Sequence, residues 1–262
     1  MDQLLEIAIK AAIDAGKKIM EIYATADFGI EMKEDQSPLT LADKVAHETI
    51  NKHLITTGIP ILSEEGKSIP WEIRKKWNLF WLVDPLDGTK EFIKRNDEFT
   101  VNIALIENHT PEMGVIFVPV SGQLYYADKN GSFKCQINVN GEQKINCVNV
   151  NSTKLPSQPS GSHFIVVGSR SHSNPETEEY TGRLNTNGKP LKLITKGSSL
   201  KLCLVASGEA DIYPRLGPTM EWDIAAGHAI ALFAGKTVTQ ISSGEPLKYN
   251  KENLLNPYFV VK

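Results

Sequence analysis

The run from Trp81 to Thr89 is the part of the sequence that most restricts the fold. It reads Trp-Leu-Val-Asp-Pro-Leu-Asp-Gly-Thr, an apolar segment that runs into two aspartates, a proline and a glycine. Pro85 and Gly88 force a tight turn after the strand, and Thr89 is placed to open a short helix. The sequence therefore predicts a buried strand that ends at Asp84 and presents two carboxylates in a turn.

The carboxylates of Asp84 and Asp87 repel each other unless a cation lies beside them. Mg²⁺ prefers octahedral oxygen coordination and keeps several waters, so a few carboxylates with a substrate phosphate form its usual site. The free backbone N–H groups of Gly88 and Thr89 at the helix start can bind a phosphate oxygen. The alternative is a plain turn, in which both aspartates bond to their own backbone.

Two other acidic segments repeat the pattern more weakly. Glu64 follows the apolar run of residues 59–62, where it either lines a cleft or is a solvated surface charge. Asp223 directly precedes an apolar helix, and its simplest role there is an N-cap. His228, one turn further on, is expected to be a packed core histidine.

Periodicity predicts the elements of the first half of the chain. Apolar residues at three- and four-residue spacing predict a helix over residues 3–23, and a capping box of Thr40 and Asp43 predicts a second helix. Antiparallel strands are predicted at 101–106, 114–118 and 124–127, with hairpin turns at Asn130-Gly131 and Asn140-Gly141.

After about residue 155 strands and helices alternate. The predicted elements are a strand at 164–167, a helix at 200–206, a strand at 210–213 and a helix at 224–233 closed by Gly235. This change predicts an N-terminal lobe, residues 1–155, with a mainly antiparallel sheet, and a smaller α/β lobe, residues 156–262. The Ser- and Pro-rich segment 151–162 is the predicted connection, and the two lobes are expected to form one catalytic unit around a cleft.

Composition excludes several classes of protein. The 262 residues are 41% hydrophobic and 23% charged with a net charge of −3, as in a soluble globular chain without the cationic field that gathers nucleic acid or anionic lipid. Three cysteines without a Cys-x-x-Cys pair indicate neither a disulfide framework nor a zinc site. No signal-peptide pattern or membrane-spanning apolar run is present. We expect a cytoplasmic location, with peripheral attachment to the cytoplasmic face of the inner membrane as the alternative.

Taken together, the acidic segments resemble the metal-binding signature of the inositol monophosphatase superfamily of lithium-sensitive phosphatases. The segments that carry this resemblance are Glu64-Glu65, Asp84-Pro85-Leu86-Asp87-Gly88-Thr89 and Trp222-Asp223. Further segments resemble the bisphosphate nucleotidase branch of the superfamily: Ser37-Pro38-Leu39-Thr40-Leu41-Ala42-Asp43, Lys90-Glu91-Phe92-Ile93-Lys94-Arg95, Gly168-Ser169-Arg170-Ser171-His172, Gly197-Ser198-Ser199-Leu200-Lys201 and Tyr213-Pro214-Arg215. The resemblance spans almost the whole chain and is weakest between about residues 130 and 165.

The resemblance implies a sugar-phosphatase-like fold, a layered α-β-α-β-α sandwich of the α+β or α/β class. The activity it implies is hydrolysis of the 3′-phosphate of 3′-phosphoadenosine 5′-phosphate to AMP and phosphate by a metal-activated water, a reaction of sulfur metabolism. It also implies two to three Mg²⁺ ions and inhibition by lithium. The alternative is an inositol or sugar monophosphate phosphatase, because the shared carboxylates do not encode the leaving group. A non-catalytic magnesium or phosphate sensor is the candidate from another class.

Family positions also imply the roles of single residues. One ion would be held by Glu64, Asp84 and the backbone carbonyl of Leu86, and the second by Asp84, Asp87 and Asp223. The catalytic groups would be Asp43 and Thr89, which orient the attacking water, together with Glu64.

Substrate contacts are expected from a larger set of residues. They are Glu64, Leu86, Asp87, Gly88, Thr89, Ser169, His172, Gly197, Lys201, Arg215 and Asp223. Lys201 and Arg215 are the extra cations that a second phosphate requires, and the alternative for both is solvated surface charge. The expected partner is a small-molecule nucleotide and no nucleic acid polymer. The sequence leaves the oligomeric state and the preference among bisphosphate nucleotides open.

Overall fold

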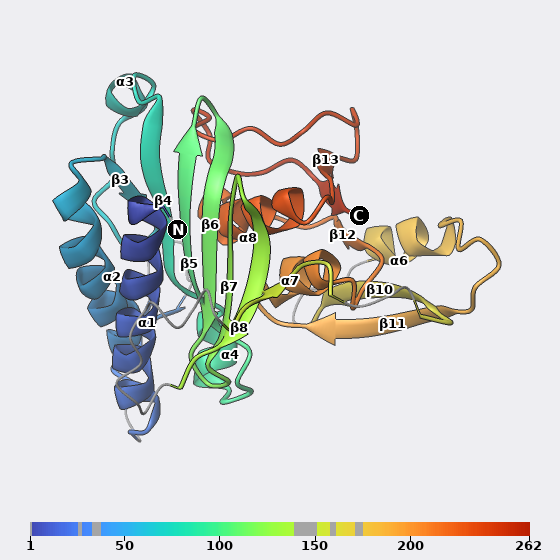
Figure 1. Ribbon diagram of the computed structural model, residues 1–262, viewed down its shortest axis with the longest axis horizontal. Helices are drawn as coiled ribbons and strands as arrows, with labels where there is room; N and C mark the ends of the chain where they lie inside the picture. Colours follow the sequence, from blue (N-terminus) through green and yellow to red (C-terminus); the bar gives the residue numbers. More distant parts are fainter. Residues whose placement is uncertain (1, 26–27, 33–37, 139–150, 158–160, 171–174) are drawn as a thin grey trace.

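A computed structural model describes residues 2–25, 28–32, 38–138, 151–157, 161–170 and 175–262. Two N-terminal helices cover one face of its large sheet (Figure 1). Helix α1 (Gln3–Tyr23) begins where the Asp2 carboxylate accepts a hydrogen bond from the Leu4 N–H at 2.8 Å. Helix α2 (Leu41–Leu54) begins with the predicted capping box, in which the Thr40 N–H donates to Asp43 Oδ2 at 2.7 Å. Both helix predictions are confirmed.

The large sheet has seven strands in the order β3-β4-β5-β6-β7-β8-β9. They are β3 (Ile61–Ser63), β4 (Leu79–Asp87), β5 (Thr100–Glu107), β6 (Thr110–Val118), β7 (Gln123–Asp128), β8 (Gly131–Gln136) and β9 (Thr153–Lys154). Strands β3 and β4 pair in parallel, and the other neighbours pair antiparallel. The prediction of a mainly antiparallel sheet is confirmed. The Asn130-Gly131 turn joins β7 to β8, whereas Asn140-Gly141 lies outside the described residues.

Strand β4 does not stop at Asp84, as the sequence predicted, but continues to Asp87. Asp84 pairs with Asn102 of β5 and Asp87 pairs with Thr100, so β4 carries one extra residue between the two pairs. Such a bulge bends a strand and redirects its side chains without ending the pairing. Pro85 therefore lies within a bulged strand and not in a turn after it.

Both faces of the sheet are buried, which explains why its strands read as nearly continuous apolar runs. Odd-numbered β5 residues such as Ile103 pack toward α1 and α2, while even-numbered ones such as Ala104 pack on the other side. That second face is covered by α7 (Leu200–Ser207) and α8 (Glu221–Phe233), as Figure 1 shows.

Beyond α7 and α8 lies a second layer of strands. Strands β10 (Phe164–Ser169) and β11 (Leu191–Lys196) pair in parallel, and β12 (Tyr213–Arg215), β14 (Phe259–Val261) and β13 (Val238–Gln240) form an antiparallel sheet in that order. Helix α6 (Pro175–Gly182) lies outside this layer (Figure 1). The layers follow the predicted α-β-α-β-α order, so the fold prediction is confirmed. The division into lobes at residues 155 and 156 stays a prediction.

Short elements complete the described chain. They are β1 (Glu31–Met32), β2 (Pro38–Leu39), the 3₁₀ turn η1 (Ile55–Thr57), α3 (Trp71–Arg74) and α4 (Thr89–Ile93). The strand predicted at 210–213 was wrong in its bounds, because only Tyr213 of that segment belongs to β12. No helix in the described ranges has the length and apolarity needed to cross a bilayer.

Candidate active site

Helix α8 brings Asp223 to the central sheet. The helix begins at Glu221, and the Met220 N–H just before it donates to Asp223 Oδ2 at 2.8 Å. Asp223 is therefore the third residue of the helix, and its predicted place before the helix was wrong. Its carboxylate still caps the first turn, which is the interaction that the sequence suggested.

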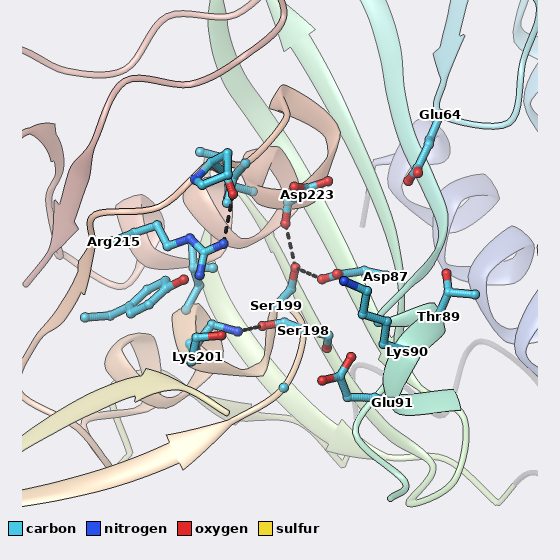
Figure 2. Close-up of a pocket in the computed structure, with 18 of the residues that line it drawn as sticks. Glu64, Asp87, Thr89, Lys90, Glu91, Ser198, Ser199, Lys201, Arg215 and Asp223 are labelled. Carbon is cyan, nitrogen blue, oxygen red and sulfur yellow. Dashed lines mark hydrogen bonds between the residues drawn. The ribbon is translucent and has the colours of Figure 1, made fainter. Parts of the chain in front are cut away.

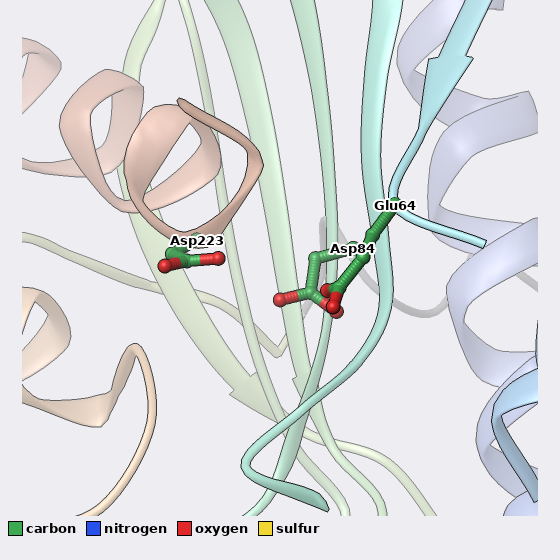
Figure 3. Close-up of side chains that lie close together, drawn as sticks. All are labelled: Glu64, Asp84 and Asp223. Atoms are coloured by element: carbon green, nitrogen blue, oxygen red, sulfur yellow. The ribbon is translucent and has the colours of Figure 1, made fainter. Parts of the chain in front are cut away.

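The alternation of side chains along β4 points Asp84 to the face of the sheet that α8 covers. Successive side chains of a strand point to opposite faces. Trp81 and Val83 of β4 pack toward α1 and α2, while Phe80 and Leu82 pack toward α7 and α8. Asp84 is in step with the second pair, and Figure 3 shows its carboxylate between Glu64 and Asp223.

Glu64, Asp84 and Asp223 form an acidic cluster. One carboxylate oxygen from each lies within 4.8 Å of the others. Glu64 directly follows β3, which pairs in parallel with β4. Glu64 and Asp84 therefore lie at the same end of this strand pair. Glu64 and Asp223 are half-buried and Asp84 is 1% exposed. The sequence-based grouping of these three segments is therefore matched by their positions.

Burial and mutual repulsion govern the charge of this cluster. Burial, followed by the negative charges of Glu64, Asp87 and Asp223, raises the pKa of Asp84 well above 3.8. Burial and the neighbouring acids likewise raise the pKa of Asp223. Each group is thus destabilised in its anionic form by the others.

The hydrogen bonding of Asp84 indicates that the cluster fits a divalent cation. Leu86 N–H donates to Asp84 Oδ1 at 3.1 Å, as in a plain turn, but buried Asp84 Oδ2 has no hydrogen-bond partner within the described part of the chain. A buried oxygen without a partner is costly, and a cation satisfies it while neutralising the repulsion. Because all the donors are hard oxygens, the site suits Mg²⁺.

Asp87 lies beside this cluster and is held by hydrogen bonds from Ser199 and Asn102. Its Oδ2 accepts from Ser199 Oγ at 2.7 Å and from Asn102 Nδ2 at 3.3 Å. Burial raises the pKa of Asp87, and the nearby Lys201 ammonium opposes that shift. The same Ser199 hydroxyl lies 2.6 Å from the Asp223 carbonyl oxygen, so one loop residue connects β4 with α8 (Figure 2).

Asp43 and Thr89 are also brought together. Thr89 Oγ1 donates to Asp43 Oδ1 at 3.1 Å, while the other carboxylate oxygen accepts from the Thr40 N–H. Asp43 is 1% exposed. Its two carboxylate oxygens make both the predicted helix cap and the predicted contact to Thr89. Gly88, with a φ of 94°, precedes α4 and places Thr89 at its first position.

A cavity of about 230 Å³ opens onto this site. Nine of the predicted site residues line it: Glu64, Asp87, Gly88, Thr89, Ser169, Gly197, Lys201, Arg215 and Asp223. Asp43, Asp84 and Leu86 do not belong to its lining and are 1 to 2% exposed. His172 lies outside the described residues.

Lys201 and Arg215 are 6% and 8% exposed, so the surface-charge alternative for them was wrong. Lys201 Nζ donates to the Ser198 carbonyl and lies 5.6 Å from the centre of the Tyr213 ring. Burial lowers the pKa of Lys201 to about 8. Arg215 Nη2 donates to the Pro218 carbonyl at 2.8 Å, while its buried Nε has no partner among the described residues.

A second cavity of about 360 Å³ adjoins the first. Ser169, Tyr213 and Arg215 line both. The second is lined mainly by apolar and small groups, including Leu193 of β11 and Leu216. A cavity lined by charged groups thus lies beside a largely apolar one.

Ser199 and Asn102 are the main site residues that sequence reasoning missed. Asn102 is a buried polar residue within the apolar β5 and donates to Ser199 Oγ at 2.8 Å. A polar residue in such a strand is itself a signal, but its partner is 97 positions away. His228, by contrast, is a packed core histidine as predicted: it hydrogen-bonds the Tyr249 hydroxyl, and burial lowers its pKa to about 4.

The order of layers and the acidic cluster define the class of protein: a layered α/β sandwich with an acidic centre between its main sheet and α8. The chain belongs to the inositol monophosphatase family, whose model matches residues 1–258. It is 45% identical to the 3′(2′),5′-bisphosphate nucleotidase CysQ of Salmonella typhimurium, over 98% of this chain and 99% of that protein. The corresponding protein of Escherichia coli K12 is 43% identical with the same coverage.

Solved structures agree with this assignment. The crystal structure of CysQ from Bacteroides thetaiotaomicron is 51% identical and superposes with a TM-score of 0.89, covering 98% of this chain and 95% of that one. The Thermotoga maritima inositol monophosphatase TM1415 is 23% identical with a TM-score of 0.73, covering 98% and 91%, and supports the fold alone.

Proposed function

We propose that this protein is a magnesium-dependent 3′(2′),5′-bisphosphate nucleotidase that converts 3′-phosphoadenosine 5′-phosphate to AMP and phosphate. One observation carries the proposal beyond the family: two members of the acidic cluster, Glu64 and Asp223, line the same cavity as two buried cations, Lys201 and Arg215. A monophosphate on the acidic side would leave those cations without a phosphate to bind. The nucleotidase relatives support the same substrate class.

The residues that would hold two to three Mg²⁺ ions are Glu64, Asp84, Asp87 and Asp223, with the carbonyl of Leu86. When bound, Mg²⁺ supplies positive charge to the phosphate and makes a nearby water easier to deprotonate. Asp84 Oδ2, which has no hydrogen-bond partner among the described residues, supports this ligand set.

The paired Asp43 and Thr89 orient the attacking water. Because the Thr89 hydroxyl donates its hydrogen bond to Asp43, the hydroxyl oxygen is left to accept a hydrogen bond from water. Asp43 itself is fixed by the Thr40 N–H and hydroxyl, so the accepting oxygen keeps a defined direction. Glu64 lies on the cavity wall near Asp84 and completes the catalytic group.

The second phosphate lies against Lys201 and Arg215. Charge-assisted hydrogen bonds from such cations are roughly twice as strong as neutral ones. The base then lies in the adjoining apolar cavity, which begins at Ser169 and Tyr213. This arrangement distinguishes a nucleotide from inositol phosphate, which has neither a second phosphate nor a base.

The test compares phosphate release from 3′-phosphoadenosine 5′-phosphate and inositol 1-phosphate in Mg²⁺, with and without lithium. We expect a much higher kcat/KM for the nucleotide and inhibition of both reactions by lithium. A higher kcat/KM for inositol 1-phosphate would return the inositol or sugar phosphatase alternative to first place. No phosphate release from either compound would favour the non-catalytic sensor.

A further inference from the structure

Glu98 forms a buried connection between the seven-stranded sheet and the β10–β11 pair. It lies two positions before Thr100, the first residue of β5, and it is 7% exposed. Its Oε2 accepts from Arg170 Nε at 2.8 Å and from the Gly197 N–H at 2.7 Å. Its Oε1 accepts from Arg170 Nη2 at 2.8 Å and from Lys196 Nζ at 3.1 Å. All three partners lie at the carboxyl ends of β10 and β11.

This carboxylate is well suited to stay charged. Burial acts to raise its pKa, but the hydrogen bonds from Arg170, Gly197 and Lys196 outweigh burial and lower the pKa of Glu98 below 4.5. A bidentate arginine pair also fixes direction as well as distance. The connection is therefore rigid and directional.

The segment next to this connection leads into the cavity. A side chain at Gly197 would put its Cβ 2.9 Å from the Glu98 carbonyl oxygen, so the loop lies directly against the start of β5. Ser198 has a φ of 42°, and its Oγ lies 3.2 Å from Thr100 Oγ1. Its carbonyl oxygen accepts from Lys201 Nζ, as Figure 2 shows.

Lys201 is thus held by a loop that Glu98 fixes at its first residue. Glu98 itself does not belong to the lining of the cavity. We propose that Glu98 is a positioning residue for substrate selection, which holds the Gly197–Lys201 segment so that the Lys201 ammonium faces the second phosphate. This inference rests on the proposed nucleotidase function.

The test uses Glu98→Gln, which keeps the shape of the side chain and removes its charge. Glu209→Gln is the matched control, because it breaks another carboxylate–lysine pair, with Lys134, and does not line the active-site cavity. We expect Glu98→Gln to raise KM for 3′-phosphoadenosine 5′-phosphate by about tenfold or more, with little change in kcat. KM for inositol 1-phosphate should change much less, and Glu98→Asp should restore part of the loss.

A second readout needs no substrate. Amide hydrogen exchange of residues 197–203 should be faster in Glu98→Gln than in wild type or Glu209→Gln, with α8 unchanged. Unchanged exchange in that segment, or equal rises of KM for both substrates, would overturn the proposal. If Glu98→Gln does not fold, Arg170→Ala replaces it, because Arg170 is exposed and supplies two of the four hydrogen bonds.

The two proposals fail in different ways. A wild-type enzyme that prefers inositol 1-phosphate would refute the nucleotidase function whatever the variants do. The exchange measurement would still decide whether Glu98 holds the segment.

Discussion

Asp84 lies among the negative charges of Glu64, Asp87 and Asp223, and one of its oxygens has no hydrogen-bond partner within the described chain. A residue in this position opposes folding of the metal-free protein, and a bound cation would offset that cost. Residues at binding sites commonly lower stability in this manner. Two consequences can be measured at this scale.

Asp84→Asn should abolish turnover and stabilise the metal-free protein, because it removes a buried charge and keeps the shape of the side chain. Folding raises the pKa of Asp84 above 3.8, so its contribution to stability is fully present below the unfolded pKa and is lost as pH rises through the folded pKa. In thermal melts of metal-free protein, wild type should therefore lose stability relative to the variant as pH rises above 3.8. A variant with more than about a tenth of the wild-type rate, a barrier change of only ~1.4 kcal/mol, would contradict a central role in metal binding.

Lys201→Ala and Arg215→Ala should each weaken the binding of a bisphosphate selectively. Charge-assisted hydrogen bonds contribute roughly 1.5 to 3 kcal/mol, which corresponds to about tenfold to a hundredfold in kcat/KM. The loss should be much smaller with inositol 1-phosphate. Lys192→Ala, at an exposed lysine of β11, is the control and should change neither substrate. Equal losses on both substrates would indicate a structural role.

At the scale of elements, α8 sets the position of Asp223 and packs tightly against Gly114 of β6. A Cβ at Gly114 would lie 2.4 Å from the Ala226 carbonyl oxygen and 2.9 Å from Ala229 Cβ. Only a glycine allows a helix to pack so near a strand. The distance between the sheet and α8 thus depends on this residue.

Gly114→Ala should destabilise the protein by roughly 1–3 kcal/mol, the usual effect of overpacking a core. Turnover should fall as well, since α8 would carry Asp223 away from Asp84. Chemical unfolding and phosphate release measure the two effects. Gly161→Ala is the control, because no described residue lies within 4 Å of the added Cβ there. Wild-type stability in Gly114→Ala would mean that the layers adjust without strain.

The same elements show what the sequence could and could not predict. Helix α1, the Thr40 capping box and the β7–β8 turn follow local rules, because each depends on residues a few positions apart. The acidic segments were found because each ends a strand or begins a helix. The bulge in β4 and the contact of Asn102 with Ser199 depend on partners that meet only after the layers pack, and no local pattern encodes them.

At the scale of the whole molecule, the acidic cluster joins the first and second halves of the chain, since Glu64 and Asp84 come from one and Asp223 from the other. Cation binding should therefore stabilise the entire fold. A ligand at a hundred times its Kd adds about 2.7 kcal/mol to the free energy of unfolding, or roughly 5–10 °C in Tm for a chain of this size. Thermal melts with Mg²⁺ and with chelator measure this shift. The Asp84→Asn variant should lose most of this increase in Tm. A wild-type Tm that does not change with Mg²⁺ would contradict an ion held by the carboxylates.

The late position of α8 in the chain has a consequence for synthesis on the ribosome. The strands that α8 covers are complete by residue 136, whereas α8 itself ends at Phe233. Until α7 and α8 are synthesised, from Leu200 and Glu221 onward, the face that carries Phe80, Leu82 and Ile116 lacks both of the helices that cover it. Exposed apolar sheet faces of this kind bind chaperones or aggregate. Ribosome-stalled chains ending near residue 155 should therefore recruit a holdase chaperone, and chains long enough to expose α8 outside the exit tunnel should release it.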